Sequence, residues 1–312
     1  MLIIASPGQG AQKPGFLSPW LELPSVASFV DELSEAAEVD IRRHGTESDA
    51  DTIRDTAVAQ PLLVAASLIT HSVLFADPAL PRPNLYAGHS VGEVAAAANA
   101  GILSNPEAMR FVAVRSRAMA KAASAEKTGM AAVVGGARED VIAAIEAAGA
   151  TPANLNSAAQ VVAAGSLTAI EQLAQNAPAR ARVIPLQVAG AFHSPFMQSA
   201  REELQDVAGE FNAEDAVVPV LSNADGSILI DGQQYVASLI TQVANTVNWE
   251  ACMHTMSNQG VTGLLELAPA GTLTGLAKRD LKSVARFDMN TPDDLDAARA
   301  FITEHAAVSK ES

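Results

Sequence analysis

The segment between residues 84 and 100 constrains the fold more than any other feature. A short predicted strand over 84–87 is followed by Gly-His-Ser-Val-Gly at 88–92 and by an alanine-rich stretch that ends before Gly101. The pentapeptide fits Gly-x-Ser-x-Gly, a sharp turn from a strand into a helix in which small residues flank a crowded serine. We therefore expect a strand, a tight turn and a helix, within an α/β domain that has a mainly parallel sheet.

The rest of the chain divides into two kinds of segment. Residues 1–127 and 191–312 alternate strands with helices, including a helix over 61–75 and one opened by a Ser104–Glu107 capping box. Residues 128–190 predict the order strand, helix, strand, strand, helix, strand, which is that of a ferredoxin-like unit. We expect a large α/β-hydrolase-like domain formed by 1–127 and 191–312, with a small ferredoxin-like (βαββαβ) domain inserted over 128–190.

Composition limits the class of protein. Hydrophobic residues make up 49% of the chain, enough for a large core, and the net charge of −15 disfavours nucleic acid as a main partner because phosphate binding needs a basic face. No apolar run approaches the ~18 residues of a membrane span and no signal peptide is recognisable, so we expect no membrane segment and a cytoplasmic location. Cys252 is the only cysteine, which excludes disulfides and cysteine metal clusters, and no metal site is expected.

Ser90, at the centre of the turn, is the candidate nucleophile. Its hydroxyl should project into solvent beside free N–H groups of the following helix, which suit an oxyanion. A nucleophilic serine needs a base, and His193 is the best candidate because its loop joins the two predicted domains, where clefts form. The other histidines lack a companion motif or point elsewhere on the turn: His44, His71, His89, His254 and His305. A purely structural turn stays open as an alternative.

The usual third member of such a site, a carboxylate between the serine and the histidine in chain order, is not evident. Most acids in that interval fit helix-surface or capping positions, and none stands at a strand end in a loop: Glu93, Glu107, Glu126, Glu139, Asp140, Glu146 and Glu171. Either another acceptor orients His193, or the chain is not a standard hydrolase. Arg115 could face inward and bind a carboxylate bidentately, although its position alone slightly favours a surface charge.

Further motifs extend this pattern over nearly the whole chain. In order they are Pro7–Gln12, Gly88–Glu93, Arg115, Asn154–Ser157, Gly190–Ser194, Gln242 ahead of Val247–Trp249, and Glu266–Pro269 with Leu276–Arg279. Together they resemble the malonyl-CoA:acyl carrier protein transacylases of type II fatty acid synthesis and the related acyltransferase domains of polyketide synthases. Thr246 and Asn248 depart from residues that are frequent in these relatives.

The resemblance implies a role for each catalytic residue. Ser90 would be the acylated nucleophile and His193 its general base and acid. The backbone carbonyl of Gln242 would orient His193, which accounts for the missing carboxylate. The backbone N–H groups of Gln9 and Val91 would form the oxyanion hole, where each donor is typically worth roughly 10²–10³ in rate.

The resemblance also implies how substrate is selected. Arg115 would pair with the free carboxylate of a malonyl group, with Met119 nearby, which replaces the surface interpretation of Arg115. Asn156, or with less support Asn154, would enter the cleft from the small domain. Phe192, like the valine after the nucleophile, points to malonyl because a large ring leaves little room for an α-methyl group.

The implied activity is ping-pong transfer of malonyl from malonyl-CoA to the phosphopantetheine thiol of acyl carrier protein, without a bound cofactor, by a monomer. The net negative charge conflicts with an acidic carrier unless a basic patch overcomes it, for which the candidates are Arg117, Lys121, Lys278, Arg279, Lys282 and Arg286. Two alternatives remain open at this point. One is a serine hydrolase or thioesterase acting on acyl thioesters, and the other is a carrier-binding homologue without activity.

Overall fold

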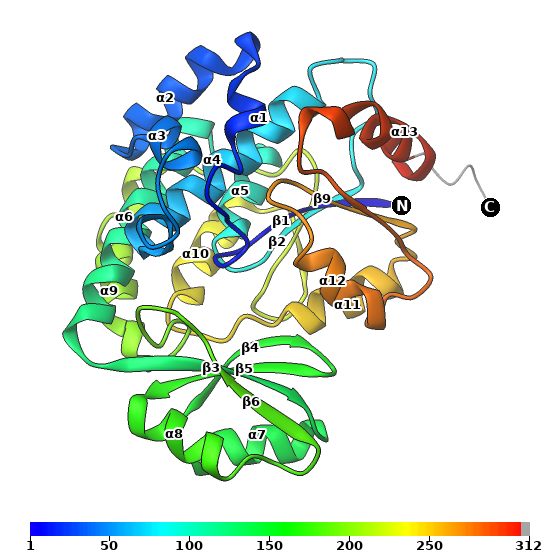
Figure 1. Cartoon of the computed structure of the whole chain (residues 1–312). Helices are drawn as coiled ribbons and strands as arrows, with labels where there is room; N and C mark the ends of the chain where they lie inside the picture. Colours follow the sequence, from blue (N-terminus) through cyan, green and yellow to red (C-terminus); the bar gives the residue numbers. More distant parts are fainter. Residues whose placement is uncertain (307–312) are drawn as a thin grey trace.

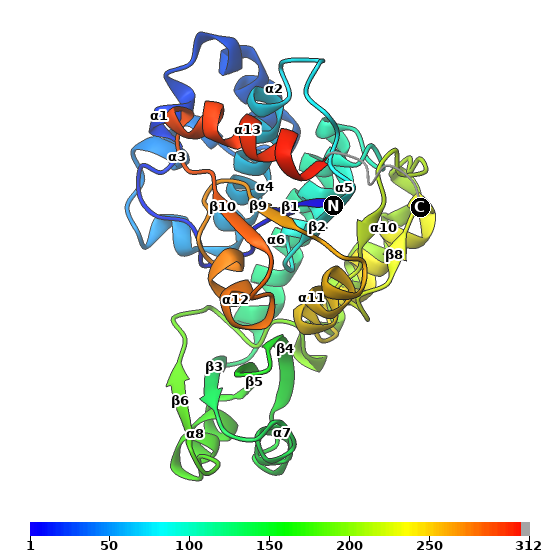
Figure 2. The ribbon, with the colours of Figure 1, turned by 90° about the vertical axis from the view of Figure 1, so that its right-hand side faces the viewer.

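Two β-sheets organise the molecule, for which a computed structural model describes residues 1–306. The larger sheet has the order β10-β9-β1-β2-β7-β8, and every neighbouring pair is parallel except β7 with β8 (Figures 1 and 2). Its strands are β1 Leu2–Ser6, β2 Leu85–Gly88, β7 Val220–Leu221, β8 Ile228–Leu229, β9 Gly263–Glu266 and β10 Ala285–Asp288. The expected mixed α/β fold with a mainly parallel sheet is confirmed.

Helices cover both faces of the larger sheet because its central strands are buried on both sides. In β1, Leu2 and Ile4 belong to the core shared with α4, α5 and α6, whereas Ile3 and Ala5 pack with α11 and α12. This alternation follows from the two-residue period of a strand. The helices are α1 Ser18–Leu21, α2 Ala27–Ala37, α3 Ile41–Thr46, α4 Thr56–Leu74, α5 Gly92–Asn99, α6 Asn105–Ala125, α9 Gln198–Asp206, α10 Gly232–Gln242, α11 Trp249–Asn258, α12 Leu273–Asp280 and α13 Leu295–Ala306.

The second sheet is antiparallel and lies below the larger one in Figure 1, with α7 and α8 on its outer side. Its strand order is β4-β5-β3-β6, and Ala131 and Val133 of β3 pack against α7 and α8 while Met130 and Ala132 join the main core. The elements are β3 Thr128–Gly135, α7 Arg138–Ala147, β4 Thr151–Ser157, β5 Gln160–Ser166, α8 Leu167–Gln175 and β6 Ala181–Pro185.

Helix α4 differs from its prediction in where it begins. It begins at Thr56 rather than at Pro61, because Asp55 caps the first turn, and Pro61 lies inside the helix, where its missing N–H removes one intrahelical hydrogen bond. By length and composition alone, α4 could cross a membrane. However, 72% of this stretch is buried inside the structure, which accounts for its apolar composition.

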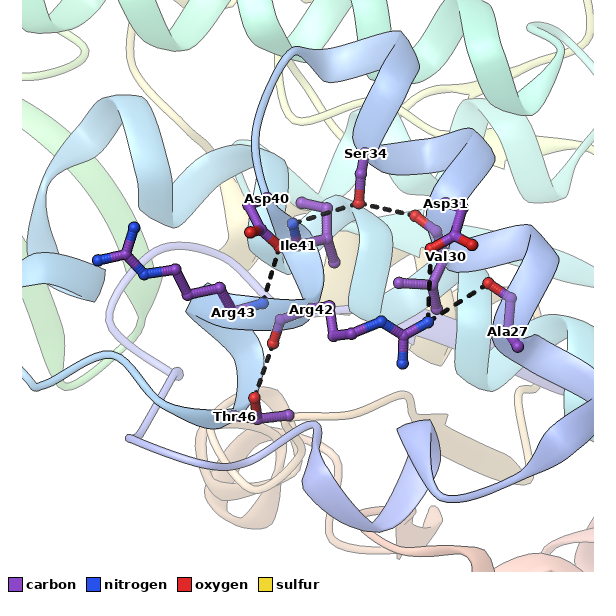
Figure 3. Close-up of polar contacts among 9 residues, drawn as sticks. All are labelled: Ala27, Val30, Asp31, Ser34, Asp40, Ile41, Arg42, Arg43 and Thr46. Atoms are coloured by element: carbon purple, nitrogen blue, oxygen red, sulfur yellow. Dashed lines mark hydrogen bonds and ion pairs between the residues drawn. The ribbon is translucent and has the colours of Figure 1, made fainter.

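The corner between α2 and α3 is held by short polar contacts (Figure 3). Asp40 caps α3 by accepting a hydrogen bond from the Arg43 backbone N–H at 2.9 Å. Ser34 Oγ donates to the Val30 carbonyl at 2.7 Å and accepts from the Ile41 backbone N–H at 3.3 Å. These contacts fold a segment for which no helix was predicted.

Candidate active site

Ser90 lies on the sharp turn between β2 and α5, with φ at +53°. The flanking glycines are required by close contacts with the neighbouring backbone. A Cβ on Gly92 would lie 2.2 Å from the Ser6 carbonyl oxygen, and one on Gly88 would lie 2.0 Å from the backbone carbon of Gly92. The predicted strand, turn and helix are therefore confirmed, and the turn presents the serine hydroxyl at the carboxyl end of β2.

His193, the expected base, lies within hydrogen-bond distance of Ser90. Ser90 Oγ lies 2.7 Å from His193 Nε2, and His193 Nδ1 lies 2.9 Å from the backbone carbonyl oxygen of Gln242. Since a carbonyl only accepts, Nδ1 carries the proton and Nε2 is free to accept one from Ser90. The imidazole is 4% exposed, and burial, with the charge of Arg115, lowers the pKa of His193 to about 3. His193 is thus neutral at physiological pH.

Within residues 1–306, no carboxylate makes a hydrogen bond to His193. The acid nearest to Ser90 in sequence, Glu93, is fully buried, so its assignment to the helix surface or a cap is wrong. The first turn of α5 faces the loop after β7 and helix α10 rather than solvent, as the bonds of Glu93 to Asn223 and Gln242 show.

The loop after β1 approaches the same turn because β1 and β2 are parallel neighbours with Ser6 opposite Gly88. The fit is tight, since a Cβ on Gly8 would lie 2.7 Å from the His89 carbonyl oxygen. Gln9 lines the pocket beside Ser90. No group within residues 1–306 accepts a hydrogen bond from the backbone N–H of Gln9 or of Val91. Both donors thus have the free N–H that an oxyanion hole requires.

Arg115, on α6, is buried, with 1% of its surface exposed. Its Nη1 donates to Gln60 Oε1 at 2.6 Å, and its Nη2 to Gln242 Oε1 at 3.0 Å and Ser90 Oγ at 3.4 Å. Burial lowers the pKa of Arg115 to about 10, against the charge of Glu93, so the guanidinium stays positive at neutral pH. The surface interpretation that its position alone favoured is wrong.

A pocket over Ser90 and His193 draws its lining from both sheets. The remaining residues of the predicted site all line it, namely Met119, Asn154, Asn156 and Phe192. Asn156 Oδ1 also lies 2.8 Å from His89 Nε2, which joins β4 to the turn that carries Ser90. Asn154 is bridged to Val247. Mostly apolar walls with a few convergent polar groups are typical of a site for an organic ligand.

Sequence reasoning missed three polar side chains of the site and the contribution of α12. Gln60 belongs to a mostly apolar helix and to no motif, so the sequence gave no signal for it. Asn223 follows β7, and a polar residue directly after a parallel strand could have been assigned to this sheet edge. Glu93 was considered in the sequence analysis, but it was not assigned to the buried site. Thr272, Leu273 and Leu276 line the pocket from α12 and the residue before it.

Three further predictions concern the surroundings of the site. Thr246 and Asn248 are accommodated locally, since Thr246 Oγ1 donates to the Pro152 carbonyl at 2.8 Å and Asn248 caps α11. Two members of the candidate basic patch are paired with surface acids, Arg117 with Glu38 and Lys121 with Glu203. No cluster of three or more histidine, cysteine or acidic side chains suited to a metal occurs among residues 1–306.

Comparison with known proteins identifies relatives that agree with one another in family and name. The acyl transferase domain family matches residues 6–291. A malonyl CoA-acyl carrier protein transacylase of Mycobacterium tuberculosis is 43% identical over 297 residues, covering 95% of this chain and 98% of the relative. A protein of the same name from Escherichia coli is 31% identical over 299 residues, covering 94% and 96%.

Solved structures agree with these relatives. The structure of the M. tuberculosis protein superposes with a TM-score of 0.93 and covers 96% of this chain and 99% of that one. A malonyl-transacylase in complex with its type II PKS acyl-carrier protein gives a TM-score of 0.91 at 29% identity, covering 96% and 99%. The chain therefore belongs to the acyl transferase family, among the malonyl CoA-acyl carrier protein transacylases.

Proposed function

We propose that this enzyme transfers a malonyl group from malonyl-CoA to the phosphopantetheine thiol of acyl carrier protein through a Ser90 malonyl ester. The names of the relatives support the substrate and the acceptor. The observation that carries the proposal is the position of Ser90 Oγ, 2.7 Å from His193 Nε2 and 3.4 Å from Arg115 Nη2. The nucleophile thus lies beside both a base and a fixed cation that can hold a free carboxylate.

In the first half-reaction, His193 Nε2 accepts the Ser90 proton as Oγ attacks the thioester carbonyl carbon. The negative oxygen of the tetrahedral intermediate accepts hydrogen bonds from the backbone N–H groups of Gln9 and Val91. The carbon–sulfur bond then breaks, and His193 gives its proton to the departing CoA sulfur. The Gln242 carbonyl stabilises the imidazolium that exists between these two transfers.

In the second half-reaction, the thiol of the carrier replaces CoA. His193 accepts the thiol proton, the sulfur attacks the ester carbonyl, and Ser90 leaves with the proton returned by His193. Both half-reactions use the same base and the same oxyanion donors, so a single site serves a ping-pong sequence. Neither step needs a metal or a bound cofactor.

Arg115 would select malonyl over acetyl. The malonyl carboxylate is two bonds beyond the ester carbonyl, so a guanidinium this close to Ser90 Oγ can reach it. A buried arginine without a carboxylate partner is unfavourable by about 3–5 kcal/mol, which disfavours acyl groups that lack a second carboxylate. Phe192, Met119, Asn154 and Asn156 would shape the rest of the acyl pocket.

We further propose that residues 1–127 and 191–312 form a large α/β-hydrolase-like domain and residues 128–190 a small ferredoxin-like one. The order β4-β5-β3-β6, with α7 and α8 on one face, supports the second assignment. On this proposal the cleft between the two domains holds the substrate, and the enzyme acts as a cytoplasmic monomer that meets its carrier protein transiently.

The test is intact-protein mass spectrometry after brief incubation with malonyl-CoA, beside acetyl-CoA and a Ser90→Ala variant. A gain of about 86 Da with malonyl-CoA, absent from the variant, is expected for a serine ester. Transfer of that mass to added holo acyl carrier protein would complete the assignment. Release of free CoA without an adduct and without transfer to the carrier would point instead to a thioesterase.

A further inference from the structure

Glu93 is buried directly behind the catalytic serine, and neither half-reaction uses it. It lies in the first turn of α5 with no exposed surface. Its carboxylate accepts hydrogen bonds from the Asn223 backbone N–H at 2.7 Å, from Tyr235 OH at 3.4 Å and from Gln242 Nε2. Every partner is a donor, so each of these hydrogen bonds favours the ionised carboxylate over the neutral acid.

Gln242 connects this acid to the reacting groups. Its side-chain Nε2 donates to Glu93, its side-chain Oε1 accepts from Arg115 Nη2 at 3.0 Å, and its backbone oxygen accepts from His193 Nδ1 at 2.9 Å. One residue thus contacts the buried acid, the cation for the substrate carboxylate and the general base.

The direction of the Gln242 amide is fixed by its two neighbours. Glu93 offers only acceptors and Arg115 offers only donors, so one orientation of the amide satisfies both. The reverse orientation would place the NH₂ group against the guanidinium and the amide oxygen against the carboxylate. Glu93 therefore determines that an oxygen, and not an NH₂ group, faces Arg115.

When ionised, above its pKa of about 8, Glu93 also supplies negative charge without occupying the arginine. The hydrogen bonds of Arg115 to residues 1–306 go to Gln60, Ser90 and Gln242, and none goes to a carboxylate. A buried guanidinium still requires a compensating charge, and the charge of Glu93 acts on Arg115 from the far side of the Gln242 amide. A direct ion pair would block the N–H groups that a substrate carboxylate needs.

We propose that Glu93 is a positioning residue that acts through Gln242. It holds Arg115 in the orientation that binds a carboxylate-bearing acyl group and keeps His193 within hydrogen-bond distance of Ser90. This inference rests on the proposed malonyl transfer. It predicts that loss of Glu93 changes the choice between acyl groups, and not only the overall rate.

The experiment measures acylation rates of Ser90 with malonyl-CoA and with acetyl-CoA by rapid quench and intact mass. Glu93→Gln keeps the size of the side chain but presents an NH₂ group to a cluster of donors. We expect the malonyl-to-acetyl rate ratio to fall roughly 10- to 100-fold, the range for losing a hydrogen bond to a charged group. Glu126→Gln, at an exposed acid after α6, is the matched control and should leave the ratio unchanged.

Gln242→Met tests the route of action, because it removes the amide and keeps the backbone carbonyl. If Glu93 acts through this amide, Gln242→Met alone lowers the ratio, and adding Glu93→Gln has little further effect in that background. Should Glu93→Gln fail to fold by circular dichroism, Gln242→Met carries the test, and an unchanged ratio in it would overturn the proposal.

The pH profile provides a readout that a merely structural role would not change. Burial raises the pKa of Glu93 to about 8 against the opposing effects of its donors and Arg115. The other titratable groups around it are Arg115, His193, Tyr235 and Cys252, whose pKa values lie outside the range from pH 6 to 9. The malonyl-to-acetyl ratio of the wild type should therefore rise between pH 7 and about 9, and that of Glu93→Gln should stay flat.

The outcomes separate the two proposals. If wild-type protein forms no malonyl ester, the proposed function fails and the role of Glu93 fails with it. If the wild type is acylated but Glu93→Gln keeps the wild-type ratio, or slows both acyl groups equally, the proposed function stands and the positioning role is overturned. If Glu93→Gln lowers the malonyl-to-acetyl ratio as much in the Gln242→Met background as in the wild type, that result would also contradict action through Gln242.

Discussion

Arg115 Nη2 and Ser90 Oγ are 3.4 Å apart, although the two residues are separated by 25 positions and lie on different elements. The contact arises because α6 packs against α4 and α5 and directs the buried guanidinium at the turn after β2. On the proposed function, a cation held beside Ser90 Oγ would recognise the acyl group next to the reacting atom. Loss of Arg115 is therefore expected to weaken recognition of a carboxylate-bearing acyl group at the acylation step itself.

Arg115→Met should abolish the preference for malonyl-CoA. Methionine keeps most of the side-chain volume but removes the charge, so a malonyl carboxylate would be buried without a partner. We expect acylation by malonyl-CoA to fall by roughly 150- to 5,000-fold, the equivalent of about 3–5 kcal/mol, with a much smaller change for acetyl-CoA. Arg117→Met, on the exposed side of the same helix, is the control and should change neither rate by more than about twofold. Equal losses for both acyl groups would contradict this role for Arg115.

Phe192→Ser should widen the range of acyl groups. The ring is 6% exposed and lines the pocket beside His193, so its removal makes room for an α-methyl group. One methyl group is worth ~1–3 kcal/mol, which corresponds to a gain of roughly 10- to 200-fold in methylmalonyl relative to malonyl acylation.

Phe196→Ser removes a ring four positions further on that lies outside the pocket lining. Competition between malonyl-CoA and methylmalonyl-CoA, read by intact mass, compares the two variants. An equal shift in both would assign the effect to general loosening of the loop rather than to the volume of the pocket.

The sequence allowed the turn, the nucleophile and the base to be predicted because each depends on local pattern. Glycines around a serine specify the turn. A histidine in a loop that joins two predicted domains indicates a position in the cleft between them. Glu93 could not be placed in this way, because the face of α5 that is buried depends on where α10 and the loop after β7 pack. Arg115 posed the same problem on α6, and only the resemblance to a family resolved it.

Acidification should destabilise the fold through buried neutral histidines. The pKa of His193 is lowered to about 3 in the folded state, below the ordinary value of 6.5 that applies when the chain is unfolded. Its contribution to stability is therefore present above pH 6.5 and is lost as the pH falls toward 3. Each such group contributes a slope of up to about 1.4 kcal/mol per pH unit, so about 1–2 kcal/mol is lost between pH 6.5 and 5.

Urea unfolding of the wild type and of His193→Gln at these two pH values measures this contribution. The variant should lose less stability on acidification than the wild type. His254→Gln, at an exposed histidine on α11, controls for the loss of a histidine as such and should follow the wild type. A His193→Gln variant that is as acid-sensitive as the wild type would show that other groups account for the loss.

The requirement for glycine in the turn can be tested by comparing two alanine substitutions. Gly92→Ala places a methyl group where the Ser6 carbonyl oxygen lies at 2.2 Å, so either β1 or the start of α5 must move. We expect a loss of more than about 3 kcal/mol in unfolding free energy, and loss of Ser90 acylation even in protein that remains folded.

Gly275→Ala, inside α12, meets no atom within 4 Å and should stabilise the protein by about 0.5–1 kcal/mol because alanine loses less backbone entropy in a helix. Both are read by denaturant unfolding and by acylation with malonyl-CoA. If Gly92→Ala proved as stable and as active as the wild type, the turn would not be constrained by its contact with β1, and the geometry proposed for Ser90 would lose its physical basis.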